Sequence, residues 1–131
     1  VAALEFRSPD ARVLVDMEMS LLKTARTQAN RYNLLLSTEH LWTDEPVQMA
    51  PQAQAALAAA ADSLGLAHIP LASFAGHDAQ AMASVCPAGM VFVPSVDGSS
   101  HSAREFTRDE DMINGANVLL RAVLHMAKNV L

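Results

Sequence analysis

The sequence predicts an α/β fold in which strands alternate with helices. Three observations support this prediction. Apolar segments of strand length recur along the 131 residues. Stretches with the three- and four-residue apolar spacing of an amphipathic helix separate them. Proline, glycine and helix-capping residues mark most of the junctions. Alternation of this kind is typical of an α/β arrangement.

The first part of the chain is predicted to form a strand, a helix and a second strand. Residues 1–6 are largely apolar and fit a strand. The helix that follows begins with a hydroxyl N-cap and a proline at its first position, Ser8 and Pro9. Apolar side chains then recur at helical spacing to about Arg31, and residues 33–42 return as an extended segment.

A connector separates this βαβ unit from the rest of the chain. Residues 43–51 carry two prolines and two acids without helical periodicity. We therefore place a domain boundary here, which divides the chain into domains at residues 1–44 and 45–131.

The second domain is predicted to continue the alternation. Pro51 opens an alanine-rich helix that Gly65 should end in the left-handed conformation. Thr107 and Glu110 form a capping box at the start of the last helix. Between these helices we expect a strand at 67–73, a short helix at 76–86 and a buried strand at 89–95. The predicted buried stripe of the last helix consists of Met112, Ala116, Leu119, Val123, Met126 and Val130.

Composition excludes several classes of function. The net charge of -5 is spread along the sequence, so no basic patch for nucleic acid is expected. Cys86 is the only cysteine, which rules out an internal disulfide and a thiolate metal cluster built from this chain alone. With this single cysteine we expect a cytoplasmic location. No apolar run reaches the ~20 residues of a membrane helix, so we expect no membrane partner. The chain begins inside a predicted strand without methionine, and we expect it to be part of a longer protein.

Two of the five histidines lie in surroundings that core packing does not explain. His77 and His101 each follow small residues in a loop or at a helix start, in "SFAGHDA" and "DGSSHSAREF". At Gly76 and His77, free backbone N–H groups of a helix start can hold an anionic or carbonyl oxygen. The alternative is an aspartate N-cap with a surface histidine. For the other three, His40, His68 and His125, we expect structural roles.

His101 is a candidate metal ligand, and Arg7 is a candidate substrate contact. A neutral imidazole is the commonest protein ligand for a catalytic divalent metal, and Glu105 follows His101 at HxxxE spacing. One histidine does not make a metal site, so any companion ligands are expected outside this chain. Arg7 can pair with Glu5 or Asp10 or offer its planar fork to a substrate carboxylate, and residue chemistry leaves these roles open.

In their order, the segments "LEFRSPD", "SFAGHDAQAMA" and "GMVFVPSVDGSSHSAREFT" resemble the C-terminal portion of the M20 metallopeptidase family. The closest resemblance is to its amidohydrolase branch of N-carbamoyl-L-amino acid hydrolases, allantoate amidohydrolases and β-ureidopropionases. It implies a two-metal hydrolase with a catalytic α/β domain and an inserted dimerisation domain. Residues 1–44 would end the inserted domain, and residues 45–131 would close the catalytic domain. Two zinc, manganese, cobalt or nickel ions would be the cofactor, and a homodimer is expected.

The resemblance also implies roles for particular residues. His101 matches the last metal ligand, and Glu105 matches a residue that supports it. Arg7 matches the arginine that grips a substrate carboxylate, while Gly76 and His77 match the stretch that lines the substrate pocket. The other metal ligands and the general base belong to the half of the family's sequence that precedes Val1. We therefore expect no catalytic base in this chain and no activity from it alone.

Departures from the family's pattern bear on the substrate. Glu5 replaces an aspartate, Ser8 a histidine, Phe74 a glycine and Ala103 a proline. None removes a metal ligand, but Phe74 can reshape the pocket.

Two alternatives to a carbamoyl hydrolase remain open. The segment can belong to an M20 peptidase or an aminoacylase acting on N-acyl amino acids, or it can serve as a non-catalytic interaction or dimerisation module. A catalytic domain without its other half leaves apolar surface uncovered, so we also expect self-association.

Overall fold

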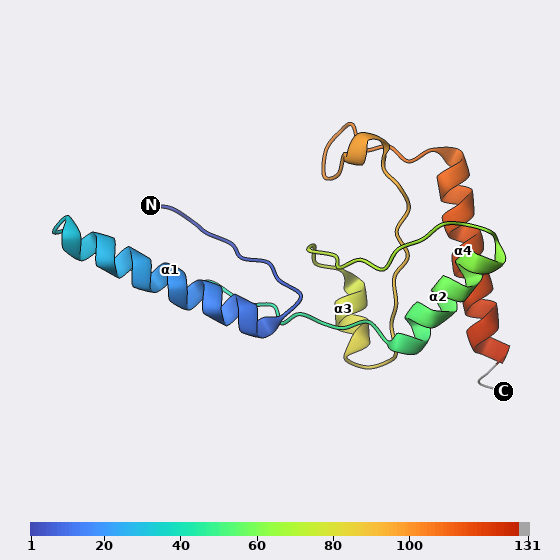
Figure 1. Ribbon diagram of the computed structural model, residues 1–131, viewed down its shortest axis with the longest axis horizontal. Helices are drawn as coiled ribbons and strands as arrows, with labels where there is room; N and C mark the ends of the chain where they lie inside the picture. Colours follow the sequence, from blue (N-terminus) through green and yellow to red (C-terminus); the bar gives the residue numbers. More distant parts are fainter. Residues whose placement is uncertain (129–131) are drawn as a thin grey trace. The chain divides into compact units, whose positions relative to one another are not determined.

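A computed structural model describes residues 1–128 (Figure 1). The chain divides into two compact units. The first consists of Val1–Gln48 with Ala72–Ala75, and the second of Met49–Leu71 with Gly76–Leu131. In chain order the elements are α1 (Ala11–Arg31), α2 (Pro51–Ser63), α3 (Asp78–Ala83), the 3₁₀ turn η1 (Val96–Gly98) and α4 (Asp109–Lys128).

Helix α1 is the one regular element described in the first unit. Asp10 is its N-cap, because its side chain accepts a hydrogen bond of 2.8 Å from the backbone N–H of Arg12. Hydrogen bonds from Arg12 lower the pKa of the Asp10 carboxyl below its ordinary value. Ser8, the predicted cap, instead accepts from the backbone N–H of Asp10 at 3.1 Å. The helix was therefore predicted correctly, but its cap was placed two residues too early.

The predicted alternation of strands with helices is not confirmed. No β-strand is assigned anywhere in residues 1–128. The predicted strands at 1–6, 33–42, 67–73 and 89–95 contain no helix and no assigned strand. A strand requires backbone hydrogen bonds to a neighbouring strand, and these segments do not pair with one another within the described residues. The sequence pattern correctly indicated that these segments are not helical. A β-sheet, however, also requires a neighbouring strand, which the pattern of one segment does not reveal.

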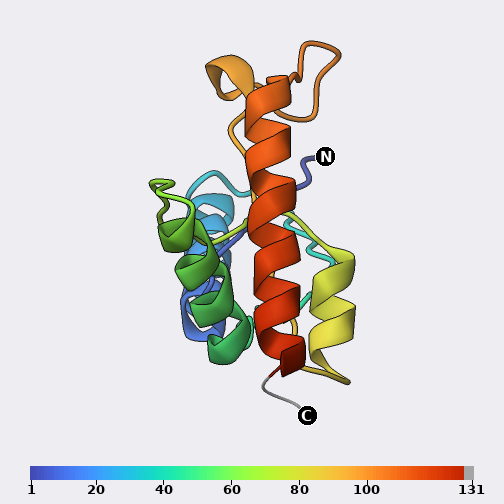
Figure 2. The same ribbon diagram turned by 90° about the vertical axis from the view of Figure 1, so that its right-hand side faces the viewer.

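Helices α2 and α4 pack side by side and form the core of the second unit (Figure 2). The buried residues at this interface are small, namely Ala56, Ala60, Ala61, Val118 and Ala122. Small side chains let two helix backbones approach closely. Helix α2 ends as predicted, because Gly65 adopts the left-handed conformation with φ 68°. Directly after this glycine, the Leu66 N–H donates to the carbonyl of Ala61 at 3.0 Å.

The buried face of α4 is not the predicted one. Gly115, Val118 and Ala122 are buried, whereas Met112, Leu119 and Val123 are each about half exposed. Of the predicted stripe, Met126 does pack against the core, and Val130 lies outside the described residues. The prediction failed because α4 is apolar on more than one face. The face with small residues packs against the rest of the unit, and larger side chains stay accessible.

The segment Gly89–Pro94 runs close to both core helices. A Cβ added to Gly89 would lie 2.8 Å from the Cβ of Ala53 in α2. A Cβ added to Gly115 in α4 would overlap the side chain of Val93. On the other side of the segment, the Phe92 ring meets the ring of His77. Successive side chains of this segment therefore contact different neighbours, as in an extended chain.

The close contact between α4 and the extended segment can be tested with Gly115→Ala. In an exposed helix this change would stabilise the protein by about 1 kcal/mol. Here we expect the free energy of unfolding to fall by about 1–3 kcal/mol, because the new methyl group overlaps Val93. The measurement is urea denaturation of the single variants and of Gly115→Ala combined with Val93→Ala. A less damaging Gly115→Ala in the Val93→Ala background would confirm the contact, whereas stabilisation by the single change would contradict it.

Candidate functional site

His101 lies in a loop that is closed at its base by hydrogen bonds. The backbone N–H of Val96 donates to the carbonyl of Phe106 at 2.8 Å. The Ser95 hydroxyl donates to the carbonyl of Ser99 at 2.5 Å and lies 3.4 Å from the carbonyl of Phe106. We call residues 95–106 the His101 loop. Its two ends are held together by groups of the loop itself, so its shape is defined locally.

The backbone of His101 adopts an uncommon conformation. Its φ is 53°, in the left-handed region that few residues other than glycine occupy. Its backbone N–H donates to Oε2 of Glu105 at 2.8 Å, and the Glu105 N–H donates to the carbonyl of Ser102 at 3.0 Å. Residues in sparsely populated conformations persist only where surrounding contacts enforce them, and they cluster at functional sites. The structure therefore brings Glu105 to His101, but at its main chain and not at its imidazole.

Gly76 and His77 lie immediately before the short helix α3. The N–H of His77 donates to the side-chain Oε1 of Gln80 at 3.2 Å. The imidazole makes an edge-to-face contact with the Phe92 ring, with 5.5 Å between ring centroids and 61° between ring planes. A Cβ on Gly76 would meet nothing closer than Gln80 Oε1 at 3.9 Å. A packed aromatic contact thus accounts for part of the His77 environment, and its predicted role at a substrate pocket stays a prediction.

Arg7 belongs to the first unit and is already engaged there. Its Nε donates to Oε1 of Glu5 at 2.8 Å, and its Nη1 donates to the carbonyl of Phe74 at 2.5 Å. The pairing with Glu5 that the sequence left open is therefore present. The contact with Phe74 was not foreseen, because the acceptor is a main-chain oxygen that leaves no mark in the side-chain pattern.

Two of the three remaining histidines are engaged in local contacts. His40 Nδ1 lies 3.2 Å from Oε1 of Glu18, and its Nε2 lies 2.9 Å from the Thr43 hydroxyl. His68 Nδ1 lies 3.7 Å from Oδ1 of Asp62. These neighbours agree with the structural roles expected for His40 and His68.

A complete metal-binding cluster does not form within residues 1–128. No group of three or more His, Cys, Asp or Glu side chains gathers there that could hold an ion. An imidazole is a suitable ligand for a divalent ion, so His101 fits as one member of a site, but it cannot form the site by itself. Metal binding at His101 requires further ligands from polypeptide beyond these residues.

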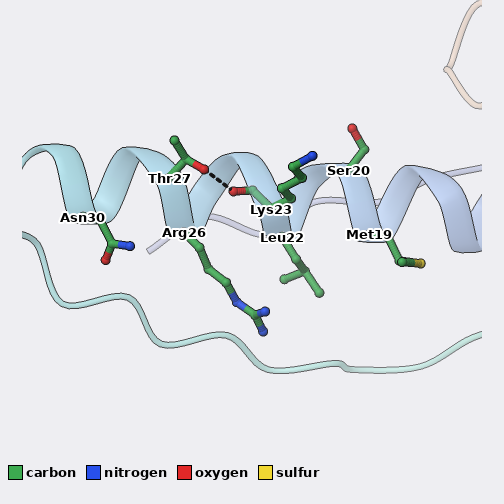
Figure 3. Close-up of a pocket in the computed structure, with 7 residues that line it drawn as sticks. All are labelled: Met19, Ser20, Leu22, Lys23, Arg26, Thr27 and Asn30. Atoms are coloured by element: carbon green, nitrogen blue, oxygen red, sulfur yellow. Dashed lines mark hydrogen bonds between the residues drawn. The ribbon is translucent and has the colours of Figure 1, made fainter.

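A pocket on α1 contains none of the predicted site residues. Its lining comes from one helix alone (Figure 3) and consists of Met19, Ser20, Leu22, Lys23, Arg26, Thr27 and Asn30. The Thr27 hydroxyl donates a hydrogen bond to the carbonyl of Lys23 at 2.9 Å. We therefore assign no chemistry to this pocket. None of the helices described up to residue 128 has the length and apolar character of a bilayer span.

Comparison with known proteins identifies the class of molecule. The solved structure of an amidase of the hydantoinase/carbamoylase family from Burkholderia multivorans matches with a TM-score of 0.86 and 39% identity. The match covers 90% of this chain and 29% of that one. The N-carbamoyl-L-amino acid amidohydrolase of Geobacillus stearothermophilus is 36% identical over 95% of this chain and 31% of its own length. The allantoate amidohydrolase of Escherichia coli is 32% identical over 95% of this chain and 30% of its own length. These relatives are amidohydrolases and amidases by name.

The model of peptidase family M20/M25/M40 matches residues 8–125, and the chain belongs to this family. The predicted resemblance to its amidohydrolases is confirmed. The chain spans about a third of the length of the curated relatives it matches.

The left-handed conformation of His101 gives a prediction about stability. Asparagine tolerates this conformation, whereas a β-branched residue does not. We expect His101→Asn to change the free energy of unfolding by less than about 1 kcal/mol. His101→Val should lower it by about 1–3 kcal/mol. Thermal denaturation of the two variants measures the difference, and equal stabilities would mean that residue 101 does not hold this conformation.

Proposed function

We propose that this chain is a segment of a two-metal hydrolase that cleaves the carbamoyl C–N bond of N-carbamoyl-L-amino acids or of allantoate-like ureido acids. The observation that carries the proposal is the His101 loop, in which His101 has a left-handed backbone, within a chain of the M20/M25/M40 family. The names of the relatives supply the substrate class.

In this proposal, His101 contributes one imidazole to a site of two divalent ions, with zinc, manganese, cobalt or nickel as candidates. The two ions, when bound, activate a water and polarise the carbonyl of the amide or ureido group. Their other ligands and the general base come from polypeptide outside this sequence. The 131 residues alone are therefore inactive.

Arg7 is the proposed contact for the substrate carboxylate. A guanidinium offers two parallel N–H donors to a carboxylate, and Glu5 already holds the Nε side of the group in place. Glu5 and the Phe74 carbonyl use two of the five N–H donors of the guanidinium, so donors remain for a carboxylate without either bond opening. Gly76 and His77 line the pocket in this proposal, with the His77 ring steadied by Phe92.

We propose that the two predicted domains of the chain belong to different domains of the hydrolase. Residues 1–44 end the inserted dimerisation domain, and residues 45–131 close the catalytic domain with its α/β sheet. Support comes from the exposed apolar side chains of α4 and of Val91, Phe92 and Val93, which the remaining catalytic domain would cover. The extended segment Gly89–Pro94 would gain neighbouring strands from the same polypeptide. Homodimerisation and self-association of the chain are part of the same proposal.

The same exposed surface favours a second candidate function, that of a non-catalytic interaction module. Leu119 and Val123 of α4 are each about half exposed and would serve a partner equally well. The reading frame upstream of Val1 distinguishes the candidates, because only the hydrolase needs metal-ligating residues there. A peptidase or aminoacylase of the same family would be distinguished from the carbamoyl hydrolase by the substrates that it hydrolyses.

The substrate class is tested by assaying the protein at its native length, loaded with each candidate metal. We expect hydrolysis of N-carbamoyl-L-amino acids or allantoate, with release of ammonia and carbon dioxide from the carbamoyl group. N-acyl amino acids and dipeptides serve as competitors in parallel assays. Turnover confined to peptides or N-acyl amino acids would reject the carbamoyl assignment.

The role of Arg7 is tested by Arg7→Ala in the same protein. Loss of a charge-assisted contact of about 1.5–3 kcal/mol should raise KM for carboxylate substrates by roughly ten- to a hundredfold. Arg12→Ala is the matched control, because Arg12 is a highly exposed arginine paired with Asp10. Steady-state kinetics provide the measurement, and a KM for the Arg7 variant equal to that of the control would rule out the carboxylate contact.

A further inference from the structure

We propose that Glu105 is a positioning residue that fixes His101 through the main-chain amide of that histidine. The inference rests on the proposed function, in which His101 is a metal ligand. It assigns Glu105 a specific mechanical task. The carboxylate does not ligate the metal or pair with the imidazole, but sets the backbone from which the imidazole projects.

The first support is the hydrogen bond itself. Oε2 of Glu105 lies 2.8 Å from the His101 backbone nitrogen, and no other hydrogen bond of the Glu105 carboxylate is found within residues 1–128. Hydrogen bonds to an ionised acceptor are stronger than those between neutral groups. The carboxylate therefore supplies a strong acceptor for the backbone amide of His101, a residue that is exposed as a whole.

The second support is that Glu105 is itself held in place. Its own N–H donates to the carbonyl of Ser102 at 3.0 Å. Both the main chain and the side chain of Glu105 therefore form hydrogen bonds within the turn. The N–H of Arg104 donates to the Ser102 hydroxyl at 3.3 Å. Residues 101–105 thus form a turn in which side-chain and backbone bonds reinforce one another. Rotation of the His101 backbone out of the left-handed region would move its N–H away from this acceptor.

The third support is the closure of the loop at its base. The hydrogen bond from the Val96 N–H to the Phe106 carbonyl joins the two ends of the His101 loop, and the Ser95 hydroxyl lies 3.4 Å from the same carbonyl. With the ends fixed, the remaining freedom lies near the tip, where the contact between Glu105 and His101 acts. A ligand held in this way before metal arrives loses less conformational freedom on binding.

The experiment uses the protein at its native length with metal removed by chelation. Hydrogen exchange of the His101 amide is compared in the unsubstituted protein, Glu105→Gln, Glu105→Ala and the control Glu110→Ala. Gln can still accept the bond through its side-chain oxygen, whereas Ala cannot. We expect exchange to accelerate at least about tenfold in Glu105→Ala and to stay within about threefold in Glu105→Gln. The amides of α4 beyond its first turn should be unchanged in every variant, and they report whether the fold is intact.

Metal affinity, measured by competition with a chelator, provides the second readout. Glu105→Ala should lose about 10- to 100-fold in metal affinity, the range typical of residues that do not bind the metal but orient a metal-ligating side chain. Glu105→Gln should restore most of it. Exchange of the His101 amide that is unchanged in Glu105→Ala, or a Gln variant as impaired as the Ala variant, would overturn the positioning role.

His101→Ala separates failure of this inference from failure of the proposed function. Loss of metal affinity in His101→Ala together with normal affinity in Glu105→Ala would reject the positioning role while leaving His101 as a ligand. Unchanged affinity in His101→Ala would reject the proposed function and the positioning role with it. In that case the exchange data would still show whether the hydrogen bond exists.

Discussion

The close approach of Gly89–Pro94 to helices α2 and α4 is the constraint on which the second unit depends. Glycine at position 115 leaves room for the Val93 side chain, and glycine at position 89 leaves room for Ala53. Because these positions carry no Cβ, the extended segment lies directly on the helix pair. The same segment leads into the His101 loop at Ser95 and then, through that loop, into α4. Its placement therefore determines where the loop begins.

Two candidate functional residues depend on this one segment. Phe92 in this segment contacts the ring of His77, and three residues later the Ser95 hydroxyl contacts the Phe106 carbonyl at the base of the loop that carries His101. Arg7 belongs to the other compact unit, where Glu5 and the Phe74 carbonyl hold it. Under the proposed function these side chains contribute to a hydrolase site, and the chain spans about a third of the length of the curated relatives it matches.

Local interactions were predictable from the sequence, and those that depend on distant or main-chain partners were not. Periodicity located α1, and the left-handed glycine at position 65 located the end of α2, because both signals act within a few residues. The strands were not predictable in this way, since a sheet requires neighbouring strands. The buried face of α4 was misassigned because apolar residues cover more than one of its faces. The motif placed Glu105 near His101, but it could not show that the carboxylate accepts from a backbone amide.

The central claim is that the imidazole of His101 binds a metal ion in a site completed by other polypeptide. The most direct measurement is anomalous diffraction at the metal absorption edge from crystals of the native-length protein. The account predicts two peaks about 3.5–4 Å apart, one of them about 2.0–2.2 Å from a ring nitrogen of His101. Peaks that lie away from His101, or a protein that binds no metal with its full complement of residues present, would contradict it.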